Sequence, residues 1–118
     1  MKRILFTFFL LAVAGLGYSQ TTYYWVGGVA PTTSINTAAN WNTSQDGSGS
    51  TRSSSTGATD ILVFDGTNVG GATPATGAVI VLANGSITCG QMKFVNGADI
   101  SFRRGTTGTS TITFAGGD

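Results

Sequence analysis

Short apolar runs separated by glycine-bearing turns dominate the chain after residue 19. Residues 60–66 hold four consecutive apolar residues between two aspartates, and residues 78–82 are again continuously apolar. From residue 84 onward apolar and polar side chains alternate, with a change of face at Gly90 that predicts a bulge or a corner. These patterns are typical of β-strands, and the segment shows no sustained helical period. The sequence therefore predicts an all-β protein.

The scarcity of large apolar side chains limits how such strands can be layered. Residues 20–118 contain 18 Thr, 10 Ser, 6 Asn and 16 Gly, which together make up half of that segment. Short strands joined at glycine corners can enclose a narrow core and stack small polar residues outside, as in a parallel β-solenoid. Asn-Gly pairs at Asn84 and Asn96 favour hairpins instead. We expect the start of a right-handed parallel β-solenoid with an N-terminal aromatic and glycine-rich cap; the alternative is an antiparallel β-sandwich.

The first nineteen residues have the pattern of a secretory signal peptide. Lys2 and Arg3 precede an apolar run over residues 4–16, and the small residues Gly17 and Ser19 precede Gln20. The run of 13 residues is shorter than the roughly 20 that a bilayer-spanning helix needs. We expect a mature chain that begins at Gln20, has no transmembrane span, and is secreted or held at a bacterial cell surface.

Titratable residues are few, and their types exclude several kinds of site. The chain has no His, no Glu, one Cys and five Asp. Histidine-based acid–base chemistry, a zinc site of the Cys/His kind and a disulfide scaffold are therefore excluded. After residue 19 there are four basic and five acidic residues, which gives a net charge of −1 and no basic patch for nucleic acid. We expect a non-enzymatic protein without a cofactor and without a nucleic-acid partner.

Two regions follow the leader. Residues 20–57 begin with an aromatic run and continue with a Ser- and Gly-rich tract over residues 44–55, so we expect a cap with a flexible loop that Trp41 pins down. Residues 58–118 hold the predicted strands and would form the first solenoid rungs. The lone Cys89 is expected to be a small buried apolar group. Five side chains of the alternating strands are expected to be buried: Phe94, Ile100, Phe102, Ile112 and Phe114.

Several short motifs together resemble the N-terminal region of secreted bacterial β-helix proteins that carry autotransporter-associated β-strand repeats. These motifs are an aromatic-Gly-Gly start at residues 24–28, Asn-Trp-Asn at 40–42, an acid, apolar run and Phe-Asp-Gly at 58–66, and the strand types at 86–94 and 110–117. Cleavage before Gln20 is similar to export signals of bacteria that use type IX secretion. The resemblance implies an adhesin-like surface protein, and because the family usually runs for hundreds of residues, an N-terminal fragment of a longer chain.

Two other functions remain open at this point. The chain could be the front end of a polysaccharide-degrading β-helix enzyme whose catalytic residues lie beyond residue 118, or a glycan-binding β-sandwich. Partners would be surface glycans or other cell-surface proteins. Four aromatic rings could stack on sugars, although we favour a cap that covers strand edges of the first rung: Tyr23, Tyr24, Trp25 and Trp41.

The remaining polar motifs have simpler explanations. Asp60 and Asp65 could be a glycosidase carboxylate pair, but five residues in one strand place them on opposite faces and more than ~16 Å apart. Residues 65–68 could hold calcium, although a turn with polar side chains explains them more simply. The glycosylation sequons at Asn42 and Asn84 are expected to be chance matches. Arg103-Arg104 could bind an acidic glycan and is more simply solvated surface.

Overall fold

A computed structural model of the chain describes residues 19–27, 33–53, 57–67, 76–82, 86–105 and 108–115. Within these ranges the regular structure consists of β-strands and one short 3-10 helix, Ala38–Asn40, so the prediction of an all-β protein is confirmed. The leader lies outside the described residues except for Ser19, and the sequon at Asn84 and the calcium candidate Asn68 also lie outside them. The described residues contain no helix with the length and hydropathy that crossing a membrane requires.

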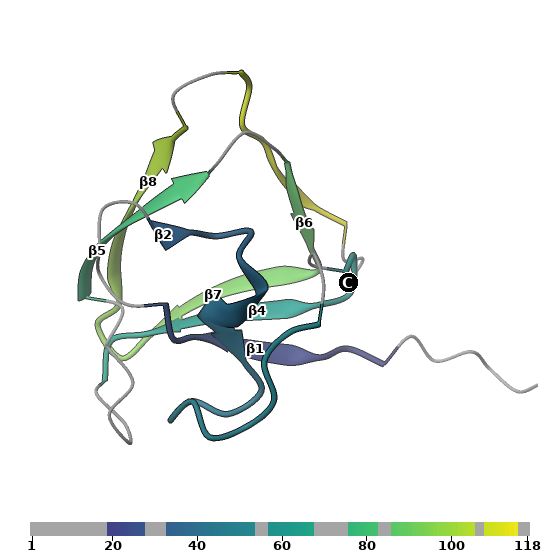
Figure 1. Cartoon of the computed structure of the whole chain (residues 1–118), viewed down its shortest axis with the longest axis vertical. Helices are drawn as coiled ribbons and strands as arrows, with labels where there is room; N and C mark the ends of the chain where they lie inside the picture. The colour runs from purple at the N-terminus through teal and green to yellow at the C-terminus, as the bar shows by residue number, and fades with distance from the viewer. Residues whose placement is uncertain are drawn as a thin grey trace, which may run out of the picture.

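The described strands form three sheets, which make the three sides of a triangle in Figure 1. Sheet A has the order β3-β1-β4-β7, with the bounds Trp41–Asn42, Thr22–Trp25, Ile61–Asp65 and Gln91–Val95. Sheet B has the order β2-β5-β8, with the bounds Thr33–Ser34, Thr76–Leu82 and Asp99–Arg104. Sheet C has the order β6-β9, with the bounds Ile87–Cys89 and Ile112–Phe114.

Successive passes of the chain pair in parallel. The strands β4, β5 and β6 belong to sheets A, B and C, and β7, β8 and β9 then return to the same sheets in the same order. Each returning strand pairs with its predecessor in parallel register, as where Phe64 lies beside Phe94 and Ile87 beside Ile112. One pair of named strands is antiparallel, β1 with β3, so sheet A is mixed. Gly90 lies at the corner between β6 and β7, as the change of face predicts.

The hairpin interpretation of the Asn-Gly pairs is wrong at the one pair that the structure describes. Asn96 and Gly97 both have positive φ, 52° and 73°, and they connect β7 to β8. These two strands lie in different sheets and do not pair with each other. The left-handed backbone that suits a tight hairpin therefore serves here to turn the chain from one sheet to the next.

The core lies between the three sheets. Parallel strands in register place like-facing residues above one another, so inward side chains of successive strands stack. Seven buried side chains form one cluster: Trp25, Ile35, Trp41, Leu62, Phe64, Ile87 and Cys89. The expected burial of Cys89 is confirmed, since none of its surface is exposed.

The expected burial of five alternating side chains is wrong for two of them. Phe94 is 50% exposed and Phe114 is 59% exposed, although Phe94 stacks on the buried Phe64 with ring centroids 5.3 Å apart. Ile100, Phe102 and Ile112 are partly buried against the core. The physical reason is position, because β7, β8 and β9 are the outermost described strands of their sheets and no further described strand covers them.

Candidate functional site

The aromatic segment at the start of the chain is built around a pair of tryptophans. Antiparallel pairing of β1 with β3 sets Trp25 opposite Trp41, and side chains opposite each other in such a pair share one face. Their ring centroids are 5.2 Å apart with an interplanar angle of 77°. Both rings also contact Phe64, at centroid distances of 5.6 and 5.2 Å. The three rings lie edge to face or tilted, which is the arrangement that aromatic quadrupoles favour.

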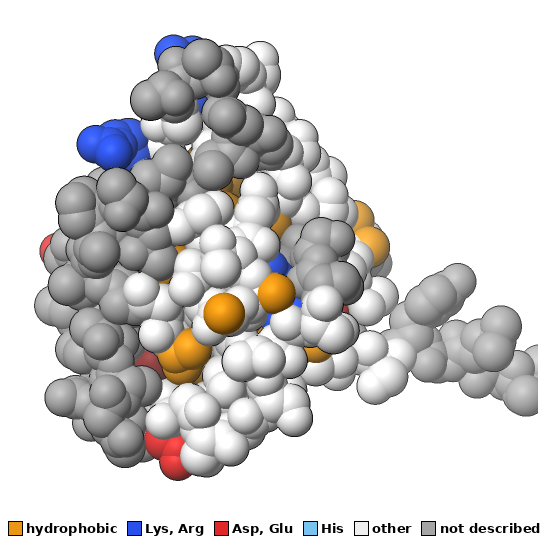
Figure 2. Space-filling view, in the orientation of Figure 1, with side chains coloured by type: hydrophobic (Ala, Val, Ile, Leu, Met, Phe, Trp, Pro, Cys, Tyr) orange, Lys and Arg blue, Asp and Glu red, His pale blue; other side chains and the backbone are white. Residues whose placement is uncertain are grey.

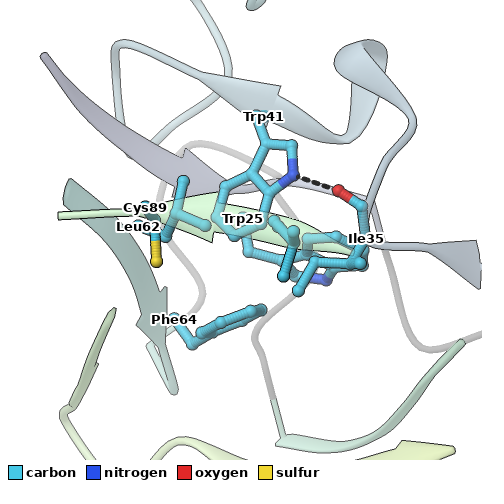
Figure 3. Close-up of a cluster of buried hydrophobic side chains, with 7 residues drawn as sticks. Trp25, Ile35, Trp41, Leu62, Phe64 and Cys89 are labelled. Atoms are coloured by element: carbon cyan, nitrogen blue, oxygen red, sulfur yellow. Dashed lines mark hydrogen bonds between the residues drawn. The ribbon is translucent and has the colours of Figure 1, made fainter. Parts of the chain in front are cut away.

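A hydrogen bond fixes the position of the Trp41 ring. Trp41 Nε1 donates to the backbone oxygen of Ile35 at 2.8 Å, and Figure 3 shows the two residues joined in this way above Phe64. A buried indole N–H needs such a partner, because leaving it unpaired would cost free energy. The side chain of Ile35 is fully buried in the same cluster. Sequence reasoning missed Ile35, whose neighbours are all polar, since a single apolar residue gives no periodic signal.

The four-ring sugar platform is not assembled on the surface. Trp25 is 3% exposed and Trp41 is completely buried, so the faces of both indole rings contact protein and are closed to a pyranose. Tyr23 and Tyr24 are half-buried, and Tyr23 packs against the core. Glycan contact by the two tyrosines stays a prediction. Figure 2 shows one face of the molecule, on which the visible described hydrophobic side chains lie in small separate spots.

The Ser- and Gly-rich tract has a hydrogen-bonded conformation organised by Asn42. The side-chain nitrogen of Asn42 donates to the backbone oxygens of Gly47 and Gly49, at 3.1 and 3.2 Å, and its side-chain oxygen accepts from the Ser44 N–H. Asn42 is 3% exposed. The sequon at this residue is therefore closed to a glycosyltransferase in this conformation, because the amide nitrogen that would be modified is buried and bonded. The expected flexibility of the tract remains a prediction for solution measurements.

Asp46 closes a small turn within this tract. Ser44 Oγ, Ser48 Oγ and the Ser48 N–H all donate to Asp46 Oδ1, at 2.6, 2.6 and 3.0 Å. Hydrogen bonds from Ser44 and then Ser48 lower the pKa of Asp46 from 3.8 to about 2, because they stabilise the charged carboxylate.

The carboxylate of Asp65 is occupied by protein donors. Its Oδ1 accepts from the Thr67 N–H at 2.8 Å and from Thr67 Oγ1 at 2.6 Å. Asn96 Nδ2 donates to both of its oxygens, and Gln45 Nε2 donates to Oδ2. Burial would raise the pKa of Asp65, but the hydrogen bonds from Thr67 and Asn96 outweigh burial and lower it. These bonds join the segments around Gln45, Thr67 and Asn96 through the carboxylate of Asp65.

Asp60 performs a comparable task at the other end of β4. Its Oδ2 accepts from the Gly57 N–H at 2.7 Å, and its backbone oxygen accepts from the N–H groups of Gly90 and Gln91. Asp60 and Asp65 therefore belong to separate turns that flank a single strand.

The described residues contain no group of three or more potential metal-ligating side chains. Arg103 and Arg104 are exposed at the end of β8.

Arg52 is a buried charge that sequence reasoning missed. It is 4% exposed, and its guanidinium carbon lies 5.7 Å from the centroid of the Trp41 ring. Nη2 donates to the backbone oxygen of Asn36 at 3.3 Å, whereas Nε and Nη1 are buried without a hydrogen-bond partner. Burial lowers the pKa of Arg52, and the charge of Asp60 acts in the opposite direction. Nothing in the Ser-rich sequence around Arg52 signals burial.

Cys89 has none of the features of a reactive thiol. Burial raises its pKa, and the charge of Asp60 raises it further. Both effects favour the thiol over the nucleophilic thiolate.

Comparisons of the chain with protein-family models, with curated proteins and with solved structures found no match.

Proposed function

We propose that the chain is an exported, non-enzymatic surface protein of the adhesin type, built as the first coils of a right-handed parallel β-solenoid. The observation that carries the proposal is the repeated order of the sheets. The strands β4, β5 and β6 are followed by β7, β8 and β9 in the same three sheets, and each pair is parallel. A chain that coils around one narrow core gives this order, because every turn adds one strand to each sheet.

The aromatic segment supports a capping role in this arrangement. The outer edge of β1 is paired with β3, and the tryptophans of both strands close over Phe64. In Figure 1 the segment that carries β2 and the 3-10 helix crosses in front of β4 and β7. A segment placed in this way protects a strand edge that would otherwise be open to pairing with other chains.

The polar residues support a structural role and not a catalytic one. The sequence has no His and no Glu, which are common catalytic acids and bases. The carboxylates of Asp60 and Asp65 accept hydrogen bonds from turn residues at opposite ends of one strand. The charge and apolar pattern of residues 1–19 supports export, and the partners we propose are surface glycans or other cell-surface proteins.

Export can be tested with the full chain expressed in a bacterium that secretes proteins. We expect the exported protein to begin at Gln20, as read by N-terminal sequencing, and to be reached by protease added to intact cells if it stays on the surface. The matched control replaces Lys2 and Arg3 by Ser, which removes the positive start of the leader and should reduce export. A chain that keeps Met1 and stays in the cytoplasm would contradict the proposal.

The capping role can be tested with Trp41→Ala against Tyr24→Ala. Loss of the fully buried Trp41 ring should cost about 3–5 kcal/mol of unfolding free energy and open the edge of β1 to aggregation. Loss of the half-buried Tyr24 ring, next to Trp25 on β1, should cost about 1 kcal/mol and leave the protein soluble. Urea unfolding and sedimentation measure the two effects, and equal losses would contradict a specific role for Trp41.

Non-enzymatic function has its own test. The exported protein is incubated with a panel of plant, algal and bacterial polysaccharides, and reducing ends are measured. We expect none to be released above the background of a heat-unfolded sample. Release that follows protein concentration would overturn the proposal, whereas retention on immobilised glycans without release would identify a partner.

A further inference from the structure

The connection between β7 and β8 holds an Asn-Gly pair, Asn96-Gly97, at an exposed turn. Asparagine is a chemically labile residue, because the backbone nitrogen of the next residue can attack the carbon of its side-chain amide. Glycine as the next residue hinders this attack least, since it has no side chain. Both residues of the pair are exposed, so water reaches them. The stability of this pair therefore depends on how the fold holds it.

The backbone of the pair is fixed in a tight turn. Asn96 and Gly97 have φ values of 52° and 73°, and the Ala98 N–H donates to the Val95 oxygen at 3.0 Å, which closes a four-residue turn. The Gly66 N–H donates to the same oxygen at 3.1 Å. A Cβ on Gly66 would overlap the backbone of Asn96 and Gly97, so these two segments are in close contact. Rotation of the peptide group between Asn96 and Gly97 must therefore move Gly66 aside.

The side chain of Asn96 is held by the carboxylate of Asp65. Asn96 Nδ2 donates to Asp65 Oδ1 at 3.0 Å and to Oδ2 at 2.9 Å. These two charge-assisted hydrogen bonds must break before the amide carbon can turn towards the Gly97 nitrogen. The charge of Asp65 also repels the negative charge that develops on the amide oxygen during an attack, which raises the barrier. Asp65 therefore opposes the reaction both by geometry and by charge.

From these observations we propose that Asn96 is a site of spontaneous deamidation through Gly97, and that Asp65 and the turn keep it unreacted while the protein is folded. The Gly97 nitrogen forms a bond to Asn96 Cγ and the Cγ–Nδ2 bond breaks. Nδ2 leaves as ammonia and takes with it the proton of the Gly97 N–H. Water then opens the succinimide ring and leaves aspartate or isoaspartate at position 96. The proposal depends on neither export nor the absence of catalysis.

The reaction sets a second carboxylate against Asp65. The product has no side-chain N–H to donate, so two favourable hydrogen bonds are replaced by repulsion between like charges. Asp65 also accepts hydrogen bonds from Gln45 and Thr67. A change at this one side chain therefore loosens the contact between the Ser- and Gly-rich tract, the turn after β4 and the β7–β8 connection. Because ammonia is lost, the change is permanent and accumulates in molecules that open at this turn.

Peptide mapping of the purified protein tests the site. The protein is incubated folded or in guanidinium chloride and then digested with trypsin, and the fragment 94–103 is weighed, because Asn96 is its one asparagine. Deamidation raises its mass by the difference between water and ammonia. We expect the folded protein to react at least about tenfold more slowly than the unfolded one. Equal rates would overturn the protection, and no reaction in denaturant would overturn the site. In denaturant the pair Asn84-Gly85, in fragment 53–93, is the internal reference and should react as Asn96 does.

Asp65→Ser tests the role of the carboxylate. Serine is chosen because asparagine would create a further Asn-Gly pair with Gly66. We expect Asn96 in the folded variant to react at least about fivefold faster than in the folded wild type. The matched control is Asp46→Ser, which removes a carboxylate that accepts hydrogen bonds in a different turn and should leave the rate at Asn96 unchanged. Circular dichroism establishes that both variants are folded. An unchanged rate in Asp65→Ser would overturn the role of Asp65.

The consequence of the reaction can be measured without waiting for it. Asn96→Asp reproduces one product, whereas Asn96→Gly removes the amide without adding a charge and suits the positive φ. We expect Asn96→Asp to lower the folding equilibrium constant about tenfold more than Asn96→Gly does, because of the repulsion by Asp65. Urea unfolding gives both constants, and this comparison remains decisive if Asp65→Ser does not fold. Equal constants for the two variants would contradict the repulsion.

Discussion

Arg52 places a positive charge over the ring of Trp41, where water does not reach it. Two of its three guanidinium nitrogens are buried without a hydrogen-bond partner, and the third makes one long bond to Asn36. A buried polar group that lacks a partner costs about 1–3 kcal/mol. The aliphatic stem of the side chain, by contrast, contributes packing. The net contribution of Arg52 to stability is therefore the difference between two terms of opposite sign.

Replacing Arg52 by Met separates these two terms. Methionine keeps a stem of similar length against Trp41 and removes the unpartnered nitrogens, so we expect the unfolding free energy to stay within about 1 kcal/mol or to rise. Arg52→Ala removes the stem as well and should cost about 1–2 kcal/mol. Urea unfolding measures both. The exposed Arg104→Met is the control and should change stability by less than about 0.5 kcal/mol. A larger loss for Met than for Ala would contradict this account.

At the scale of elements, the connection between β7 and β8 constrains the backbone at two glycines. Gly97 has a φ of 73°, and a Cβ there would meet nothing within 4 Å. Gly66, which follows β4, lies against this connection, and a Cβ on Gly66 would overlap the backbone of Asn96 and lie 2.6 Å from the carbonyl carbon of Gly97. Gly97 is therefore needed for its positive φ, and Gly66 is needed because a side chain would collide with the neighbouring backbone.

Alanine at these two glycines should therefore have unequal effects. Gly97→Ala strains one residue and should cost about 1 kcal/mol. Gly66→Ala pushes two backbone segments apart and should cost more than about 2 kcal/mol, since backbone cannot move aside as a flexible side chain can. Urea unfolding compares the two variants: if the dependence of the unfolding free energy on urea concentration is the same for both, the shift of each midpoint gives the loss of stability. Equal costs would show that the close approach at Gly66 is relieved by small shifts.

The sequence predicts the longer elements well and the shortest ones poorly. The positions of β4 to β9 follow from their apolar runs and alternation, and the corner at Gly90 follows from a change of face. The two-residue strands β2 and β3 give no such signal, because their pairing is decided by contacts with distant strands. For the same reason the burial of Ile35 and Arg52 could not be predicted. The exposure of Phe94 depends on what covers its strand, which local pattern does not contain.

At the scale of the whole molecule, the acid and base content determines how stability depends on pH. The chain has no His and no Glu, so few groups titrate between about pH 5 and pH 8. Hydrogen bonds to the charged forms lower the pKa of Asp46, to about 2, and of Asp65. A carboxyl whose pKa is lower in the folded state stabilises the fold above its unfolded pKa, and this contribution is lost as the pH falls through the folded value.

We therefore expect a nearly flat stability profile near neutrality and a decline from about pH 4 towards pH 2. The unfolding free energy in urea, measured at closely spaced pH values, gives the profile. Replacing Asp46 and Asp65 by Asn should flatten the decline. The exposed Asp99→Asn removes one negative charge without either hydrogen-bonded turn and serves as the control. A steep change between pH 6 and pH 7 would contradict the expectation.

The parallel ladders join residues at unequal separations along the chain. In the ladders β4–β7, β5–β8 and β6–β9 the partnered residues are 30, 22 and 25 apart, as in the pairs Ile61 with Gln91, Ala78 with Ile100 and Ile87 with Ile112. Each strand is thus aligned by the neighbour it lies against and not by the length of the preceding connection. Lengthening the connection at one corner should leave the strand alignment intact in the two ladders that the corner connects. Corners are therefore the places where foreign peptides can be grafted onto this protein.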